Sequence, residues 1–253
     1  MIESAIPSWL ERTELLIGKE AQEKLLSSKI LLVGLGGVGS FAGEFLVRAG
    51  IGSITIIDGD VVDPTNKNRQ LQALDSTVGQ VKADLLKERF LDINPNLDIV
   101  AYNKFLEPED MKVLLETQSF DFVLDCIDSI QPKLSLLHSA KSQKLKIISA
   151  MGAGGKLDPS KIKIGDISTT RDCKFAQQVK KQLKKKGIKH GILAVYSDEI
   201  QPKEALQYTE SAKYKRSYYG TISYMPALFG LRMAAEVLRR LMLNINAINS
   251  AII

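Results

Sequence analysis

The sequence has little of what stabilises small secreted domains or builds metal centres. Its 253 residues include two cysteines, which exclude a four-cysteine zinc site and give no sign of a disulfide framework. The N-terminus lacks the basic start and long apolar run of a signal peptide. The uncharged stretch at 217–231 has 15 residues, too few to span a membrane as a helix. These absences predict a cytoplasmic protein without a membrane segment.

Charge is distributed unevenly along a chain of otherwise ordinary composition. Apolar residues make up 45% and charged residues 25%, as in a globular protein that can bury a full core. Residues 161–190 hold ten Lys or Arg and two Asp, a local net charge of +8 in a chain whose total is +5. Such a local excess predicts an anionic partner, for which nucleic acid is the usual candidate.

The first 150 residues alternate between strand-like and helix-like segments. The strand-like segments are residues 30–33, 53–57, 97–102, 121–125 and 146–150. The helix-like segments are residues 38–48, 78–93, 108–117 and 130–142. This alternation predicts an α/β fold with a parallel sheet covered by helices on both faces. Ligands of such sheets bind at the carboxyl ends of the strands, so we expect the loops after residues 33, 57, 125 and 150 to surround one crevice.

Beyond residue 150 the pattern changes. We expect strands at 162–165 and 192–197, a lysine-rich helix at 174–186 and a C-terminal helix at 225–243. Residues 198–220 show weak periodicity and are expected to form a long loop. Long loops in compact domains often serve as lids or binding segments.

A glycine-rich loop follows the first strand-like segment. Gly34, Gly36 and Gly39 have the spacing G-x-G-x-x-G. The first glycine permits a tight turn, the second lets the backbone approach a phosphate, and the third lets the next helix pack closely on the sheet. The N–H groups at the start of that helix favour an anion. The loop therefore predicts a nucleotide site.

The residues beyond the glycine loop favour ATP over a dinucleotide. Asp58 follows the second strand, where a carboxylate can hold ribose hydroxyls, and this feature alone fits NAD as well as ATP. Arg69 and Lys82 add two cations of the kind that an ATP-cleaving enzyme places over the phosphates. Asp128 follows the fourth strand and is a candidate ligand for the Mg²⁺ ion that ATP brings, and Asp125 competes with it for this role.

Five motifs, in order, give the chain a resemblance to a known family. GLGGVG, IDGD, NKNRQ, VGQVKAD and DCIDS resemble the ThiF/MoeB adenylating enzymes, whose fold is shared with ubiquitin-activating enzymes. The resemblance covers roughly residues 9–155. It implies a Rossmann-like, doubly wound, mainly parallel sheet with an antiparallel extension in the C-terminal part. The residues to which it gives a role are Gly37 and Asp58 for the adenosine side of ATP, Asn68, Arg69 and Lys82 for the phosphates, and Asp128 for Mg²⁺.

The resemblance extends to the segment ERTELLIG near the N-terminus. In the family an arginine before this helix reaches into the ATP site of the partner subunit, and Arg12 lies at that position. The resemblance therefore implies a homodimer with a shared site. The whole chain, 1–253, is then one adenylating domain, with a nucleotide-binding half at 1–155 and a basic half at 156–253 for substrate binding and dimerisation.

The rest of the chain resembles one branch of the family, the bacterial tRNA threonylcarbamoyladenosine dehydratases. The matching segments are MGAGGKLDP at 151–159, GDIS at 165–168, KKGIKHGI at 185–192 and SDE at 197–199. The resemblance implies an ATP-dependent, ligase-type enzyme that adenylates the carboxylate of threonylcarbamoyladenosine in tRNA, promotes ring closure and releases AMP. It implies ATP and Mg²⁺ as cofactors and the modified tRNA as partner, with a sulfur-relay protein as a candidate second partner.

Basic side chains in the second half are candidates for contact with tRNA. Residues 208–219 interleave four tyrosines with cations, an arrangement that can hold phosphates while rings stack on unpaired bases. The candidates are Lys180, Lys181, Lys184, Lys185, Lys186, Lys213, Lys215 and Arg216.

Three other functions fit parts of the pattern. The first is adenylation of the C-terminus of a ubiquitin-like sulfur-carrier protein, against which stand the missing four-cysteine zinc site and the basic second half. The second is a non-catalytic nucleotide-binding module, which would leave Arg69, Lys82 and Asp128 without a purpose. The third is an NAD-dependent oxidoreductase, for which the sequence offers no proton-transfer residue at a recognisable place.

Overall fold

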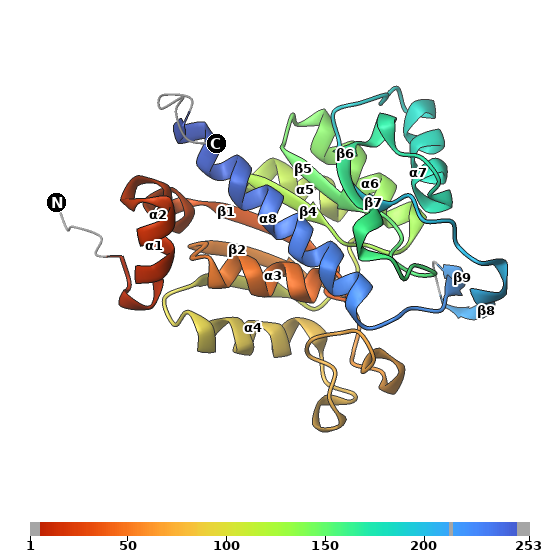
Figure 1. Cartoon of the computed structure of the whole chain (residues 1–253), viewed down its shortest axis with the longest axis horizontal. Helices are drawn as coiled ribbons and strands as arrows, with labels where there is room; N and C mark the ends of the chain where they lie inside the picture. The colour runs from red at the N-terminus through yellow and green to blue at the C-terminus, as the bar shows by residue number, and fades with distance from the viewer. Residues whose placement is uncertain (1–5, 213–214, 247–253) are drawn as a thin grey trace.

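A seven-stranded sheet forms the centre of the computed structural model, which describes residues 6–212 and 215–246. The strand order is β3-β2-β1-β4-β5-β7-β6, and every neighbouring pair is parallel except β6 and β7, which are antiparallel (Figure 1). This confirms the predicted α/β class, the mainly parallel sheet and the antiparallel extension. The strands are β1 (Lys29–Val33), β2 (Ser53–Ile57), β3 (Asp98–Tyr102), β4 (Phe122–Asp125), β5 (Ile147–Ala150), β6 (Ile162–Asp166) and β7 (Leu193–Ser197).

Helices cover both faces of the sheet, because the central strands are apolar on both faces. In β1, Ile30 and Leu32 belong to one buried cluster, and Leu31 and Val33 belong to the other. The helices on the Ile30 face are α2 (Lys19–Ser27), α3 (Gly39–Arg48), α4 (Lys82–Ile93) and α8 (Tyr224–Asn246). Those on the Leu31 face are α5 (Pro108–Thr117), α6 (Ile130–Ser142) and α7 (Lys174–Lys185).

Helix α8 crosses α3 at close range (Figure 1). A Cβ atom at Gly230 would lie 2.4 Å from the carbonyl oxygen of Val38, so only glycine lets the two helices approach so closely. Val38 directly precedes α3 and belongs to the glycine-rich loop. The start of the C-terminal helix is therefore packed against that loop.

The strand order reverses between β1 and β4, whose carboxyl ends lie side by side. This is the switch point at which open α/β sheets bind their ligands. The loops after β1, β2, β4 and β5 meet there, as the sequence predicts, and the loop after β3 joins them.

The expectation of a long loop at 198–220 is wrong. This segment contains a two-stranded antiparallel hairpin of β8 (Leu206–Ala212) and β9 (Lys215–Tyr219), preceded by a short 3-10 turn, η6 (Lys203–Ala205). The hairpin pairs with no strand of the main sheet, so the hydrophobic periodicity by which a core-facing strand is recognised is absent from its sequence.

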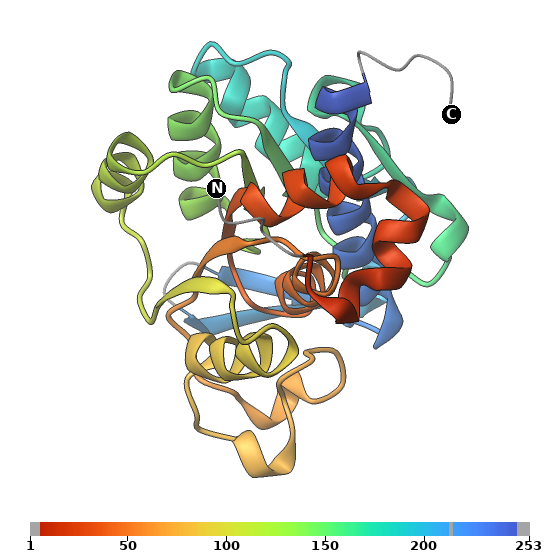
Figure 2. The ribbon, with the colours of Figure 1, turned by 90° about the vertical axis from the view of Figure 1, so that its left-hand side faces the viewer.

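The N-terminal helix α1 (Glu11–Ile17) packs against α2 at one end of the molecule. The β8–β9 hairpin lies at the other end, as Figures 1 and 2 show together. Among the described residues, no helix is long and apolar enough to cross a membrane.

Candidate active site

The carboxyl ends of the central strands border one large open pocket. Of the residues that the sequence assigns to nucleotide and metal binding, Gly39 and Asp125 do not line it. The residues that do are Gly34, Gly36, Gly37, Asp58, Asn68, Arg69, Lys82 and Asp128. The fold thus brings together side chains that are up to 94 positions apart in the sequence.

The glycine-rich loop needs glycine at its first and last positions for steric reasons. Gly34 has a φ of +91°, and a Cβ there would lie 2.8 Å from the backbone of Cys126. A Cβ on Gly39 would lie 1.8 Å from the carbonyl oxygen of Gly34. Gly39 therefore acts behind the pocket, where it lets α3 begin directly against β1, as the spacing predicts.

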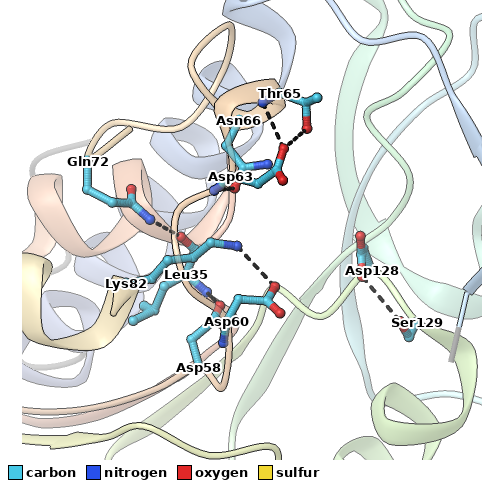
Figure 3. A network of polar contacts seen from close by, with 10 residues as sticks. All are labelled: Leu35, Asp58, Asp60, Asp63, Thr65, Asn66, Gln72, Lys82, Asp128 and Ser129. Atoms are coloured by element: carbon cyan, nitrogen blue, oxygen red, sulfur yellow. Dashed lines mark hydrogen bonds and ion pairs between the residues drawn. The ribbon is translucent and has the colours of Figure 1, made fainter. Parts of the chain in front are cut away.

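Asp58 links the second strand to the glycine-rich loop. Its Oδ2 accepts a hydrogen bond from the backbone N of Leu35 (2.6 Å), and its Oδ1 accepts one from the backbone N of Asp60 (2.8 Å; Figure 3). Burial raises the pKa of Asp58, although the charge of Lys82 and the two backbone N–H groups act against that rise. Each carboxylate oxygen keeps a further lone pair, which is where ribose hydroxyls can donate.

Gln72 supports the same loop from behind and was not found by sequence reasoning. Its Nε2 donates to the carbonyl oxygen of Leu35 (2.8 Å) in a buried position (Figure 3). A glutamine in a polar stretch carries no signal of burial, so only the fold reveals this contact.

Lys82 lies at the floor of the pocket as the first residue of α4. Its side chain is 6% exposed, and its Nζ lies 3.0 Å from Oδ2 of Asp60, which is 54% exposed. The helix starts here rather than at the expected residue 78, because Gly79 has a φ of +83° and Val81 bridges to Val61. Asp60, which lies two residues after Asp58, thus orients the lysine.

Asn68 and Arg69 form a second polar group above the glycine-rich loop. Arg69 Nη1 donates to Oδ1 of Asn68 (2.8 Å) and to the carbonyl oxygen of Thr65 (2.9 Å). Asn68 Nδ2 donates to the carbonyl oxygen of Thr221 (2.9 Å), just beyond the hairpin. Burial lowers the pKa of Arg69, against the charges of Asp128 and Asp63, but a guanidinium remains charged at any physiological pH.

Asp128 lies across the pocket from Lys82 and Asp60 (Figure 3). Its Oδ1 accepts a hydrogen bond from Ser129 Oγ (3.2 Å). The charge of Arg69 interacts with that of Asp128, so the two side chains share one electrostatic environment. Asp128 is therefore positioned beside the place where phosphates would meet Arg69.

Asp125 is fully buried and does not reach the pocket. Its Oδ2 accepts from Lys133 Nζ (2.5 Å) and Ser149 Oγ (2.6 Å), and its Oδ1 accepts from the backbone N of Ile127 (3.1 Å). Both carboxylate oxygens are thus engaged inside the protein. Of the two competing aspartates, Asp128 lines the pocket and Asp125 does not.

Further pocket residues come from segments that sequence reasoning left out. Lys104 and Phe105 follow β3, and Phe105 packs over Gly59, which follows Asp58. The rule about carboxyl ends of strands predicts this loop as well as the other four. Phe175 comes from the start of α7, and Tyr218 comes from β9.

Arg12 is not brought to the pocket of its own chain. It is exposed on α1, at the end of the molecule away from the hairpin.

The lysines predicted to contact tRNA differ in their surroundings. Lys180 is engaged inside the protein, because its Nζ donates to the carbonyl oxygens of Ser168 (3.3 Å) and Thr170 (2.8 Å). Lys181, Lys184, Lys185 and Lys186 are exposed. Lys213 and the side chains of Lys215 and Arg216 lie outside the described residues.

The model of the ThiF family matches residues 10–251 of this chain. The chain belongs to the ThiF family. It is 40% identical over 241 residues to the tRNA threonylcarbamoyladenosine dehydratase of Bacillus subtilis (strain 168), a match that covers 92% of this chain and 94% of that protein. The crystal structure of the Escherichia coli tRNA N6-threonylcarbamoyladenosine dehydratase in complex with ATP is similar with a TM-score of 0.86 at 30% identity, covering 98% and 99% of the two chains.

Similarity to another branch of the ThiF family is confined to part of the chain. The molybdopterin-synthase adenylyltransferase of Escherichia coli (strain K12) is 35% identical over 130 residues, which is 51% of this chain and 51% of that protein. The similarity to the dehydratase therefore extends over 92% of this ThiF-family protein, and the similarity to the adenylyltransferase extends over about half of it.

Neither cysteine of this ThiF-family protein is suited to form a thioester. Burial raises the pKa of the Cys126 thiol, and its Sγ lies 3.9 Å from the sulfur of Met233. Cys173 is completely buried in the core between sheet and helices. The site therefore offers no activated cysteine thiol to which an acyl group could be transferred.

Proposed function

We propose that this chain is an ATP-dependent tRNA threonylcarbamoyladenosine dehydratase. It adenylates the carboxylate of the threonylcarbamoyl group and promotes its cyclisation with release of AMP. One observation carries the proposal: the residues assigned to ATP and the exposed tyrosines of the hairpin border the same open pocket, so one cavity can receive both ATP and an unpaired base. The similarity to dehydratases over more than 90% of the chain supports it.

The reaction divides into two displacements. A carboxylate oxygen of the substrate attacks the α-phosphorus of ATP, and pyrophosphate leaves. An atom of the carbamoyl group then attacks the acyl carbon and gives up a proton to solvent, while AMP leaves with the former carboxylate oxygen. The substrate has lost one water, and no nucleophile of the enzyme takes part. Ring closure is intramolecular, so positioning supplies much of the rate, with effective molarities of about 10⁵–10⁸ M in favourable cases.

Five polar residues of the pocket have roles in the first displacement. Lys82 and Arg69 stabilise the charge that develops on the phosphates, and Asp60 and Asn68 hold those two cations in place. Asp58 accepts hydrogen bonds from the ribose hydroxyls and fixes the loop through Leu35.

The residues of the pocket fit Mg²⁺ only together with phosphate. No group of three or more His, Cys, Asp or Glu side chains in the described part of the chain is arranged to hold a metal ion by itself. Mg²⁺ commonly binds one or two carboxylates and completes its shell with phosphate oxygens and water. Asp128 would hold the ion, which when bound neutralises charge on the phosphates of ATP.

The far side of the pocket suits RNA. Tyr208 and Tyr218 are 75% and 47% exposed, and both line the pocket from the hairpin. Exposed aromatic rings stack on unpaired bases, and nearby cations bind the RNA backbone.

A cytoplasmic location and a sulfur-relay partner remain predictions.

The proposed function predicts a loss of mass from the modified nucleoside. After incubation of the protein with ATP, Mg²⁺ and tRNA that carries threonylcarbamoyladenosine, we expect mass spectrometry to find the nucleoside lighter by one water, with one AMP formed per conversion. Omission of ATP is the control. If the mass stays unchanged while a small protein that ends in Gly-Gly stimulates ATP–pyrophosphate exchange, the sulfur-carrier function replaces this one.

We also propose that Arg12 completes the pocket of a partner subunit in a homodimer. Arg12 is exposed, and Leu15 and Leu16 on the same helix are 87% and 84% exposed, an apolar surface that a second copy would cover.

The shared site predicts complementation between two inactive variants. Chains with Arg12→Ala and chains with Lys82→Ala are each expected to lose activity. Mixed dimers are expected to recover up to about half of the wild-type activity, because one of their two sites has both residues intact. Heterodimers purified with two different tags provide the measurement. No recovery in such heterodimers would contradict the shared site.

A further inference from the structure

Both histidines of the chain lie in one basic pocket outside the active site. We call it the distal basic pocket, and its polar residues are His138, Lys141, Ser142, Lys186, Lys189 and His190. His138 and His190 are 52 positions apart and show no ligand spacing in the sequence, so only the fold reveals the cluster. No carboxylate is among the described residues that line it.

The distal basic pocket is connected to the active site by two helices. Helices α6 and α7 pack against each other (Figure 1). Their first residues, among them Gln131 and Lys174, line the active-site pocket. Residues at or just beyond their last turns line the distal basic pocket. At 1.5 Å per residue, the twelve residues of α7 separate the two pockets by about 18 Å.

The surface between the two pockets is also positively charged. Lys181, Lys184 and Lys185 are exposed along α7. A stacked nucleic-acid strand advances about 3.4 Å per phosphate, so about five phosphates span 18 Å. A strand that leaves the active site along α7 therefore meets lysines on its way to the distal basic pocket.

Helix dipoles explain the presence of only some of the basic side chains in the distal basic pocket. Lys141 lies in the last turn of α6, and Lys186 caps α7, where cations are favourable. His138 precedes the last turn of α6, and Lys189 and His190 lie in the loop toward β7, where that effect is absent. Helix ends therefore do not explain why three further basic side chains converge there.

The loop leaves room for the ammonium group of Lys141. Gly191 has a φ of +86°, and its missing Cβ would lie 2.7 Å from Lys141 Nζ. The carboxylate at the rim, Asp166, is engaged by the backbone N of Ser168 (2.9 Å) and of Gly191 (2.5 Å). It therefore holds the loop in place, and its charge also interacts with that of His190, so the positive charge of the pocket comes mainly from Lys141, Lys186 and Lys189.

We propose that the distal basic pocket binds a backbone phosphate of the tRNA, about five nucleotides from the modified adenosine. The proposal rests on the proposed function, because the active site must hold that adenosine for the spacing to apply. The pocket thus makes binding depend on the length of the RNA strand and favours a full-length tRNA over a short oligonucleotide.

The test compares two RNAs on two variants. The RNAs are a full-length modified tRNA and a five-nucleotide RNA centred on the modified adenosine, which is too short to reach the pocket. For Lys141→Ala/Lys189→Ala we expect the Kd for tRNA to rise about tenfold. The magnitude of the slope of log K against log salt should fall by about 1, since one phosphate contact contributes about 0.7–0.9. Binding of the short RNA should be unchanged.

The control removes the same charge elsewhere. Lys19→Ala/Lys112→Ala changes two exposed lysines on α2 and α5, and its Kd for tRNA should stay within twofold of the wild type. His138→Ala/His190→Ala provides a second variant that spares the end of α6. Unchanged tRNA binding in both pocket variants, or an equal loss for both RNAs, would overturn the proposal. If the wild-type protein does not convert the modified nucleoside at all, the proposed function itself fails.

Discussion

Replacing Lys82 with alanine is expected to lower kcat/KM for the ATP-dependent reaction by about 10²–10³-fold. A preorganised donor aimed at developing charge commonly contributes this much. Lys82 is buried at the floor of the pocket, where water screens its charge little. Its loss also leaves Asp60 as an unpaired negative charge beside the phosphates. Formation of the dehydrated nucleoside, followed by mass spectrometry, measures the effect.

Two further variants show whether the loss of activity is due to the charge of Lys82 or to a change in the structure around it. Asp60→Asn keeps the lysine and is expected to retain most of the activity. Lys87→Ala removes a lysine from the same helix outside the pocket and should leave kcat/KM unchanged. If Lys82→Ala keeps kcat/KM within threefold of the wild type while its melting temperature is unchanged, Lys82 does not act on the phosphates.

Replacing Lys133 with methionine is expected to lower the free energy of unfolding by about 3–5 kcal/mol. Lys133 and Asp125 form an ion pair in which both side chains are 0% exposed. Removing one partner leaves an uncompensated buried charge, whose cost is about this large. In a chain of this size 1 kcal/mol shifts the melting temperature by about 2–4 °C, so the midpoint should fall by about 10 °C.

The double variant Asp125→Asn/Lys133→Met shows whether the buried charge causes this loss. It lacks the uncompensated carboxylate and keeps an oxygen for the backbone N of Ile127, so we expect it to be more stable than Lys133→Met alone. If instead the two substitutions destabilise additively, the pair makes no specific contribution. Urea denaturation of Lys133→Met, of Asp125→Asn and of the double variant provides the comparison.

The sequence predicts the nucleotide-binding half well, because its central strands are buried on both faces. Such strands appear as continuous apolar runs, and the strand expected at 53–57 has those bounds in the structure. The roles of Gly34 and Gly39 follow from steric requirements that depend on a few neighbouring residues, so spacing alone predicts them. The meeting of Asp58, Lys82 and Asp128 in one pocket follows from the rule for parallel sheets.

Features that depend on contacts between distant segments could not be predicted from the sequence. Lys133 lies on a helix where a lysine is ordinarily taken to face solvent, and its burial depends on Asp125 from another element. Strands β8 and β9 lie beside the pocket rather than in a core, so they carry no apolar alternation. The presence of His138 and His190 in one pocket likewise requires α6 and α7 to lie side by side.

The hydrogen bond from Asn68 to Thr221 has a thermodynamic consequence. It joins the loop that holds Arg69 to the segment between the hairpin and α8, 153 positions away. A ligand that moves one of these two segments breaks the hydrogen bond, and the other segment then loses roughly 1 kcal/mol of stabilisation. This loss corresponds to about a fivefold change in the affinity for a ligand bound at the other segment. Linkage makes such an effect reciprocal, so RNA would alter the affinity for ATP by the same factor as ATP alters that for RNA.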